Sequence, residues 1–259
     1  VSFTPIALPN RVDTSVAAGL APLYRYRIAT VTTESGSVIT PTYGLANPCA
    51  VPVTLAPEVN TSSCYPVYWT PGGYAQPIRD WFNKYVVTKV TSTTVPGIDP
   101  TGGAPQAVTS YAYLGGAAWH FDDNELVKAK YRTYGQFRGY GQVKTFTGEA
   151  TTGPLTLAET TFYRGMSKNN NTTAVTVSDS LGGVHEDLNQ LAGRALEERS
   201  YLGDGGPLEQ ASITAYWVSA ATATRIRSGL PDLTATLVAP VVSHTRQAVT
   251  STGATTWRA

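Results

Sequence analysis

The sequence has little charge and lacks the features that mark membrane-spanning or nucleic-acid-binding chains. Only 14% of the 259 residues are charged, well below the usual quarter, and 19 basic and 18 acidic residues leave a net charge of +1. No basic run supplies the field that attracts nucleic acid or an anionic membrane, so we expect neither partner. No stretch approaches the roughly 18 apolar residues of a transmembrane helix, so we expect no membrane span.

Cysteine is limited to Cys49 and Cys64, which flank a Pro-, Thr- and Ala-containing segment that reads as an irregular loop. A disulfide here would close a loop of about 15 residues and stabilise the fold by about 3 kcal/mol. Two buried free thiols are the alternative. We expect the disulfide, and a secreted protein, because few lysines and many threonines are typical of extracellular surfaces. No secretory signal precedes Val1, which indicates a mature product or a fragment.

The residues that are abundant favour strands. The chain contains 37 threonines and 15 tyrosines but only 6 phenylalanines, and Thr and Tyr suit half-buried pleated surfaces. Its 24 glycines and 17 prolines are spread along the chain, as expected where many short strands need many turns. The sequence therefore predicts an all-β protein: an antiparallel meander, a large curved sheet or a sandwich, with at most one or two short helices. We expect a β-rich domain over residues 1–165 and a continuing β-strand segment over 166–259 packed on it.

Local patterns place individual elements. Residues 24–43 alternate in polarity around Glu34–Ser37 and predict a hairpin, with Gly36 free to take a positive φ. Residues 195–201 predict a further strand. Short helical turns are expected over 77–84, where a proline stands first, and within 187–194.

The stretch from Ala107 to Gly148 carries the clearest strand pattern. It begins with period-two alternation, which places successive side chains on opposite faces of a sheet. We expect a tight turn at Gly115–Gly116, because paired glycines commonly end a strand. A second alternating run over 142–147 closes the stretch. The pattern predicts a β-meander with one aromatic row facing inward.

Aromatic residues gather between residues 65 and 85. Exposed Tyr and Trp rings can stack on sugars, so Tyr68, Trp69 and Tyr74 are candidate glycan-binding residues. The alternative is that these rings fill the core of the sheet or cover its edge.

Candidate catalytic groups are few. Asp122, Asp123, Asn124 and Glu125 form the one compact acidic cluster, which lacks the alternating ligands of a calcium loop and reads as a solvated turn. The three histidines, His120, His185 and His244, are far apart and give no local support for zinc. We therefore expect no catalytic residue, no metal site and no cofactor.

Several motifs of the central stretch resemble those of proteins with RHS (YD-type) repeats. The motifs are Tyr111-Ala112-Tyr113, Gly115-Gly116, Asp122-Asp123 and Arg138-Gly139-Tyr140-Gly141-Gln142-Val143. They resemble the middle region of the B component of ABC-type toxin complexes and large secreted RHS proteins of actinobacterial type. The resemblance is strongest over residues 65–165. It implies structural roles for Tyr111, Tyr113, Arg138, Gly139, Tyr140 and Gly141.

The resemblance implies a shell of long β-strands that encloses a toxic or otherwise active domain. The self-cleaving signature of the family, Asp-Pro-x-Gly-Leu, has no match in this chain, so the chain would form part of the wall. Our first hypothesis is a non-enzymatic, secreted scaffold that contacts another chain, or the rest of its own polypeptide, through open sheet edges. The second hypothesis is a carbohydrate-binding β-protein. The third is a secreted hydrolase that uses the region of Asp122 and Glu125.

Overall fold

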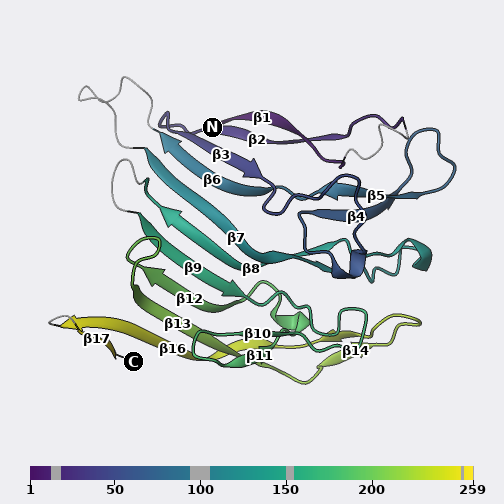
Figure 1. Ribbon diagram of the computed structural model, residues 1–259. Coiled ribbons are helices and arrows are strands. Elements are labelled where there is room, and N and C mark those ends of the chain that lie inside the picture. Colours follow the sequence, from purple (N-terminus) through teal and green to yellow (C-terminus); the bar gives the residue numbers. More distant parts are fainter. Residues whose placement is uncertain (13–18, 94–105, 150–154, 252–253, 259) are drawn as a thin grey trace.

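The computed structural model describes residues 1–12, 19–93, 106–149, 155–251 and 254–258 (Figure 1). Within these ranges the chain forms one 11-stranded sheet and three two-stranded sheets. This confirms the all-β class. Helical structure in the described part is limited to three single turns of 3-10 helix: η1 (Pro57–Val59), η2 (Ala129–Tyr131) and η3 (Asn189–Leu191).

The large sheet is an antiparallel meander in which spatial order follows chain order. Its strands are β1 (Ser2–Pro9), β2 (Tyr24–Thr32), β3 (Val38–Gly44), β6 (Val86–Thr93), β7 (Ala107–His120), β8 (Gln136–Thr147), β9 (Thr156–Phe162), β12 (Ala195–Tyr201), β13 (Leu208–Val218), β16 (Val238–Ser251) and β17 (Ala254–Arg258). The small sheets pair β4 (Cys64–Trp69) with β5 (Ile78–Asn83), β10 (Thr176–Ser178) with β11 (Val184–Glu186), and β14 (Ala223–Arg225) with β15 (Leu233–Ala235).

The small sheets all belong to one end of the large sheet. Consecutive strands run in opposite directions, so every second connection emerges at the same end. The pairs β4–β5, β10–β11 and β14–β15 lie in the connections that follow β3, β9 and β13, the third, seventh and ninth strands of the meander, which run in the same direction. Figure 1 shows the three pairs gathered there, and we call this the insertion end. The opposite end has short hairpin connections at residues 33–37 and 202–207.

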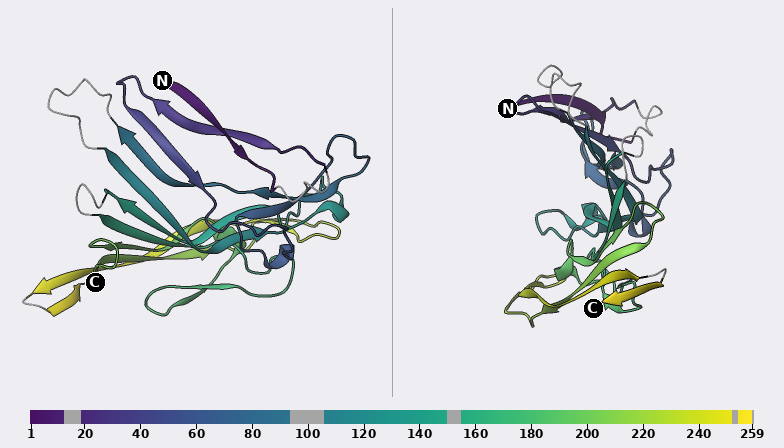
Figure 2. Two further views of the ribbon diagram at one scale, coloured as in Figure 1. Left: turned by 45° about the horizontal axis from the view of Figure 1, so that its top comes forward. Right: turned by 90° about the vertical axis from the view of Figure 1, so that its left-hand side faces the viewer.

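The large sheet is curved and open. Figure 2 shows it from one side as an arc, with the N-terminal strands at one tip and the C-terminal strands at the other. In the sheet as described, the strands at the tips, β1 and β17, each pair on one side only. The sheet runs across residue 165, where we expected a domain boundary, because β9 pairs with β12.

Most local predictions hold. β2 and β3 form the expected hairpin, with Gly36 at φ 82° in the turn, and β12 spans the predicted 195–201. η3 lies inside the predicted turn at 187–194. The helical turn expected over 77–84 is wrong, because those residues form β5. Pairing with β4 in register from Cys64↔Asn83 to Trp69↔Ile78 overrides the local preference of an N-terminal proline.

The turn expected at Gly115–Gly116 is also wrong. β7 continues through both glycines, and its pairing with β8 shifts register there, so the pair forms a bulge. Both glycines have positive φ, 77° and 70°. A Cβ on Gly116 would lie 2.8 Å from the Cβ of Thr61, so this position also allows a distant loop to approach the strand closely.

Three clusters of buried hydrophobic side chains lie in the part of the chain that the structure describes. The central cluster lies on β7 and β8 and contains Ala117, Trp119 and Tyr140. The cysteine cluster joins Val12, Cys64 and Trp81. The C-terminal cluster contains Tyr163, Leu191, Leu196 and Ile213, so it includes η3 and residues of β12 and β13.

Candidate functional site

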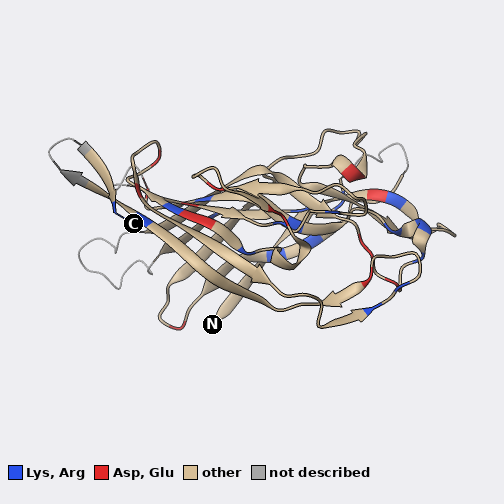
Figure 3. Ribbon diagram, turned by 90° about the horizontal axis from the view of Figure 1, so that it is seen from below, with Lys and Arg blue, Asp and Glu red and all other residues tan. Residues whose placement is uncertain are grey.

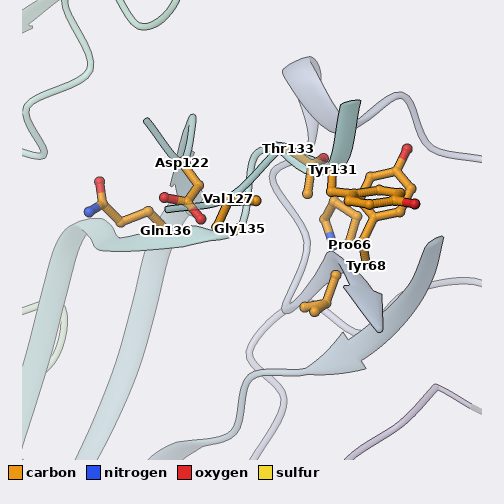
Figure 4. Close-up of a pocket in the computed structure, with 9 residues that line it drawn as sticks. Pro66, Tyr68, Asp122, Val127, Tyr131, Thr133, Gly135 and Gln136 are labelled. Carbon is orange, nitrogen blue, oxygen red and sulfur yellow. The ribbon is translucent and has the colours of Figure 1, made fainter. Parts of the chain in front are cut away.

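A cleft of about 390 Å³ opens at the insertion end, between β4 and the connection from β7 to β8 (Figure 4). Strand β4 supplies one wall, and the connection with η2 and the start of β8 supplies the other. The lining residues are Pro66, Val67, Tyr68, Asp122, Val127, Tyr131, Thr133, Gly135 and Gln136.

One side of the cleft is aromatic. The rings of Tyr68 and Tyr131 lie with their centroids 5.4 Å apart and are tilted by 47°. The Tyr131 hydroxyl donates to Oε1 of Gln76 at 3.3 Å, which fixes the ring on η2. Such ring faces can pack against the apolar face of a sugar or another flat ligand.

The other side of the cleft carries one carboxylate and one amide. Oδ1 of Asp122 accepts the backbone N–H of Asn124 at 3.1 Å, and the backbone N–H of Asp122 donates to Thr133 O at 2.8 Å. The side chain of Arg138 donates twice to Oε1 of Gln136, at 2.8 and 3.2 Å. These bonds leave Oδ2 of Asp122 and Nε2 of Gln136 without a hydrogen bond among the described residues. The cleft can therefore accept and donate hydrogen bonds beside its two rings, an arrangement suited to binding.

Of the three predicted glycan-binding residues, only Tyr68 lines this cleft. The indole N–H of Trp69 donates to Oδ2 of Asp80 at 3.3 Å, and its ring packs edge-on against Phe82. Trp69 thus packs within the β4–β5 pair. Tyr74 lies exposed on the turn that begins at Pro71. Tyr131 was missed as a candidate, because it approaches Tyr68 only through folding.

The rest of the acidic cluster is held by arginines. Arg227 is almost fully buried, donates through Nη1 to the backbone carbonyl of Asp123 at 3.0 Å, and bonds the Asp123 carboxylate through Nη2. Arg225 forms an ion pair with Glu125, whose other oxygen lies 3.7 Å from Nε of Arg227. These hydrogen bonds and ion pairs hold the segment around β14 against the β7–β8 connection. The solvated turn we expected is therefore a structural junction, and Asp122 is the member of the cluster that faces the cleft.

The histidines remain apart. Nδ1 of His120 lies 2.8 Å from Phe121 O, and burial lowers the pKa of this imidazole. Nε2 of His185 lies 2.9 Å from Oδ2 of Asp179. Burial opposes ionisation of Asp179, but bonds from His185 and from the N–H groups of Gly183 and Leu181 lower its pKa overall. Within the described residues, no group of three or more His, Cys, Asp or Glu side chains could hold a metal ion.

Four carboxylates are buried in the described part of the chain, those of Asp80, Glu159, Asp187 and Glu197, and no sequence pattern singled them out. Asp187 accepts the backbone N–H groups of Arg164, Gly165 and Met166 at 2.7, 2.7 and 3.1 Å. Glu197 accepts the backbone N–H of Ser180 at 3.0 Å and also its hydroxyl. Glu197 anchors its loop to β12 of the large sheet, whereas Asp187, directly after β11, holds two connections together. No local sequence motif distinguishes either residue from surface acids.

The predicted disulfide between Cys49 and Cys64 is confirmed, with the two Cα atoms 6.0 Å apart. The loop that it closes packs on the sheet. Trp119 Nε1 donates to Ser62 O at 2.9 Å, and the hydroxyls of Ser63 and Tyr140 lie 3.1 Å apart. The bridge therefore anchors the segment that covers the bulge of β7.

The residues singled out by the RHS resemblance lie on β7 and β8. Tyr140 is buried in the central cluster, and its ring lies 5.0 Å from that of Tyr113, whose hydroxyl donates to Val87 O at 2.7 Å. Tyr111 is half-buried. Gly139 has φ 85°, and a Cβ on Gly141 would lie 3.6 Å from the guanidinium carbon of Arg164.

Comparison with protein-family models, with curated proteins and with solved structures finds no match to this chain. The RHS resemblance therefore stays a prediction. In the part of the chain that the structure describes, no helix has the length and apolar character needed to cross a membrane. The disulfide is compatible with an extracellular protein.

Proposed function

We propose that this chain is a non-catalytic wall segment of a secreted RHS-type protein, acting as a scaffold or encapsulating shell for a toxin or partner. The observation that supports it most is the open sheet with two uncovered tips. Among the described strands, β1 and β17 each lack a neighbour on one side. An unpaired strand edge offers backbone donors and acceptors to another chain.

The distribution of apolar side chains supports the same function. At the N-terminal tip, Phe3 is 62% and Tyr26 79% exposed. At the C-terminal tip, the exposed side chains include Val241, Val249 and Trp257. Exposed apolar patches on a soluble fold commonly mark protein contacts. A wall that continues into further strands, or that lies against a partner, would cover both tips.

The charge distribution disfavours catalysis at the acidic cluster. A retaining glycosidase needs two carboxylates about 5 Å apart, one of them a proton donor. Asp123 and Glu125 are paired with Arg227 and Arg225, which leaves Asp122 as the carboxylate in the cleft. Figure 3 shows how little of the ribbon carries charge. Replacing Asp122 or Glu125 by alanine should leave any hydrolytic activity in the preparation unchanged.

The proposed function can be tested by purifying the polypeptide from the organism that makes it without denaturation. Size-exclusion chromatography with mass detection should find it joined to further sequence or bound to a companion chain. The mass should then be well above the 27.5 kDa of this chain. Elution of this chain alone, at its own mass, would contradict the proposal.

A second candidate function is carbohydrate binding in the cleft, favoured by the paired rings of Tyr68 and Tyr131 beside Asp122. A glycan array should then detect a ligand whose binding is lost in Tyr131→Ala and kept in Tyr74→Ala. Tyr74 is the matched control because its ring lies outside the cleft. Equal binding by both variants would exclude the cleft as the glycan site.

A further inference from the structure

The two open edges of the sheet differ in what they offer to an added strand. Backbone N–H groups of a strand point alternately to its two sides. The N–H of Asn10, directly after β1, donates toward the β2 side, to Leu23 O at 2.7 Å. By alternation, the positions of Pro9 and Pro5 face away from β2. Proline has no N–H, so the open edge of β1 lacks two of its donors.

Strand β17 has no proline that would remove a backbone donor from its open edge. Its sequence, ATTWR, contains no proline, and it pairs with β16 from Gln247↔Arg258 to Ser251↔Ala254. Its outer edge has no neighbouring strand in the described sheet. Figure 1 shows β17 at the far tip of the sheet from β1. The fold therefore protects one edge and leaves the other able to pair.

A groove lined mainly by β13 and β16 reaches β17 at Trp257. It has a volume of about 760 Å³, and its lining includes Leu181, Ile213, Arg246 and Trp257. The guanidinium of Arg246 lies 5.3 Å from the ring centroid of Trp257, and its Nη2 donates to the hydroxyl of Ser180 at 2.6 Å. Trp257 is 48% exposed. A side chain of an added strand could pack against this indole.

Charge identifies the chemistry of the partner. Strands β16 and β17 contain His244, Arg246 and Arg258 but no acidic residue. Arg246 lies 3.9 Å from the buried carboxylate of Glu197, so the exposed cation that β17 offers is Arg258. Strands β1 and β2 also lack acidic residues, and β2 carries Arg25 and Arg27. A second copy added head to tail would bring these two basic tips together, which is unfavourable. An acidic segment complements the β17 tip.

We propose that β17 is the acceptor edge for β-strand addition by an extended, acidic segment of a partner chain, with Trp257 and Arg258 as its contacts. This inference rests on the proposed function, since it names the partner of the same wall. Main-chain hydrogen bonds would supply the affinity, and the alternate side chains of the added strand would meet the groove. Acidic side chains would meet Arg258, which is exposed on β17.

The test uses the purified chain and a synthetic peptide that alternates Glu with Val over one strand length. A matched peptide that alternates Lys with Val is the control. The acidic peptide should bind and slow hydrogen exchange in β17 but not in β1. Arg258→Glu and Trp257→Ala should each weaken binding about tenfold, equal to ~1.4 kcal/mol, while Arg25→Glu near the β1 edge leaves it unchanged. Both residues are exposed, so unchanged thermal unfolding should show that the variants fold.

Three results would overturn this inference. They are equal binding of the two peptides, protection of β1 in place of β17, and protection of β17 that rises with chain concentration in the absence of peptide. The last result would show that the edge of β17 pairs with a second copy of this chain. Because the assay needs only the purified chain, its failure is separable from failure of the proposed function. If the chain elutes alone from its natural source but still binds the acidic peptide, the proposed wall function is contradicted and the acceptor role of β17 is not.

Discussion

The centre of the sheet and its two tips are built differently. In the centre, the cysteine loop covers β7, and Trp119, Tyr140 and Ala117 are almost inaccessible. At the tips, β1 is exposed along nearly its whole length, and β16 and β17 carry exposed Val and Trp side chains. The connections of the insertion end thus protect the middle of the sheet but not its tips. The difference indicates that the centre folds on its own contacts, whereas the tips are suited to contacts from outside.

The largest difference in unfolding free energy between the centre and the tips should appear when one aromatic residue in each region is replaced by alanine. Trp119 is 3% exposed, so Trp119→Ala removes a packed ring and should lower the free energy of unfolding by about 3–5 kcal/mol. Tyr26→Ala at the N-terminal tip should change it by less than about 0.5 kcal/mol. Urea unfolding of both variants measures the contrast. Similar losses would show that the tips are as tightly packed as the centre.

The disulfide sharpens the comparison, because it anchors the loop that covers the centre. Its cysteines are separated by 15 residues, and replacing both by serine should lower the free energy of unfolding by about 3 kcal/mol. Thermal unfolding with and without a reductant measures the effect. The reductant should destabilise the natural chain and leave the double-serine variant unchanged. A natural chain insensitive to a reductant that opens the bridge would contradict this role.

A smaller effect is expected from Asp187, which directly follows β11 and holds the loop at 164–166 that follows β9. Asp187→Asn replaces an acceptor oxygen by a donor and leaves backbone N–H groups of the loop unsatisfied in a buried site. The cost should be about 1–3 kcal/mol in urea unfolding. Asp204→Asn is the matched control, because Asp204 is exposed in its pair with Lys144 and should contribute less than about 1 kcal/mol. Equal losses of unfolding free energy in the two variants would show that Asp187 contributes no more to stability than an exposed carboxylate.

The smallest effect at neutral pH belongs to Tyr163 of the C-terminal cluster. Burial raises the pKa of Tyr163 from 10.0 to about 12. The folded chain therefore retains a proton that the unfolded chain loses between these values, so stability falls as the pH rises from 10.0 toward 12. Tyr163→Phe should be nearly neutral at pH 7 and should show a shallower decline in unfolding free energy at alkaline pH. The exposed Tyr26→Phe should leave that decline unchanged, and an unaltered slope in Tyr163→Phe would refute the account.

Strand positions could be predicted from the sequence because period-two patterns and turn residues are local. The hairpin at 24–43 and the strand at 195–201 are examples. Gly115–Gly116 could not be interpreted locally, since the close approach at Gly116 is set by Thr61, which reaches β7 from a distant loop. The same reason explains the error at 77–84, where pairing with β4 decided the conformation.

The candidate site was less predictable than the fold. The sequence identified Tyr68 and Asp122 by residue type, but nothing local shows that η2 places Tyr131 against Tyr68. Likewise, Asp123 and Glu125 looked like solvated acids because their partners, Arg227 and Arg225, lie about a hundred residues away in the chain. Clefts and junctions built from separate connections depend on packing that local patterns do not encode.

Hydrogen exchange, resolved by strand, tests the central claim most directly. In the isolated chain, β7 and β8 should exchange slowly, while β1, β2, β16 and β17 exchange fast. In the assembly purified from the natural source, the strands of at least one tip should become as protected as β7. Tips that are as protected as the centre in the isolated chain, or that gain no protection in the natural assembly, would contradict a wall completed by contacts from outside.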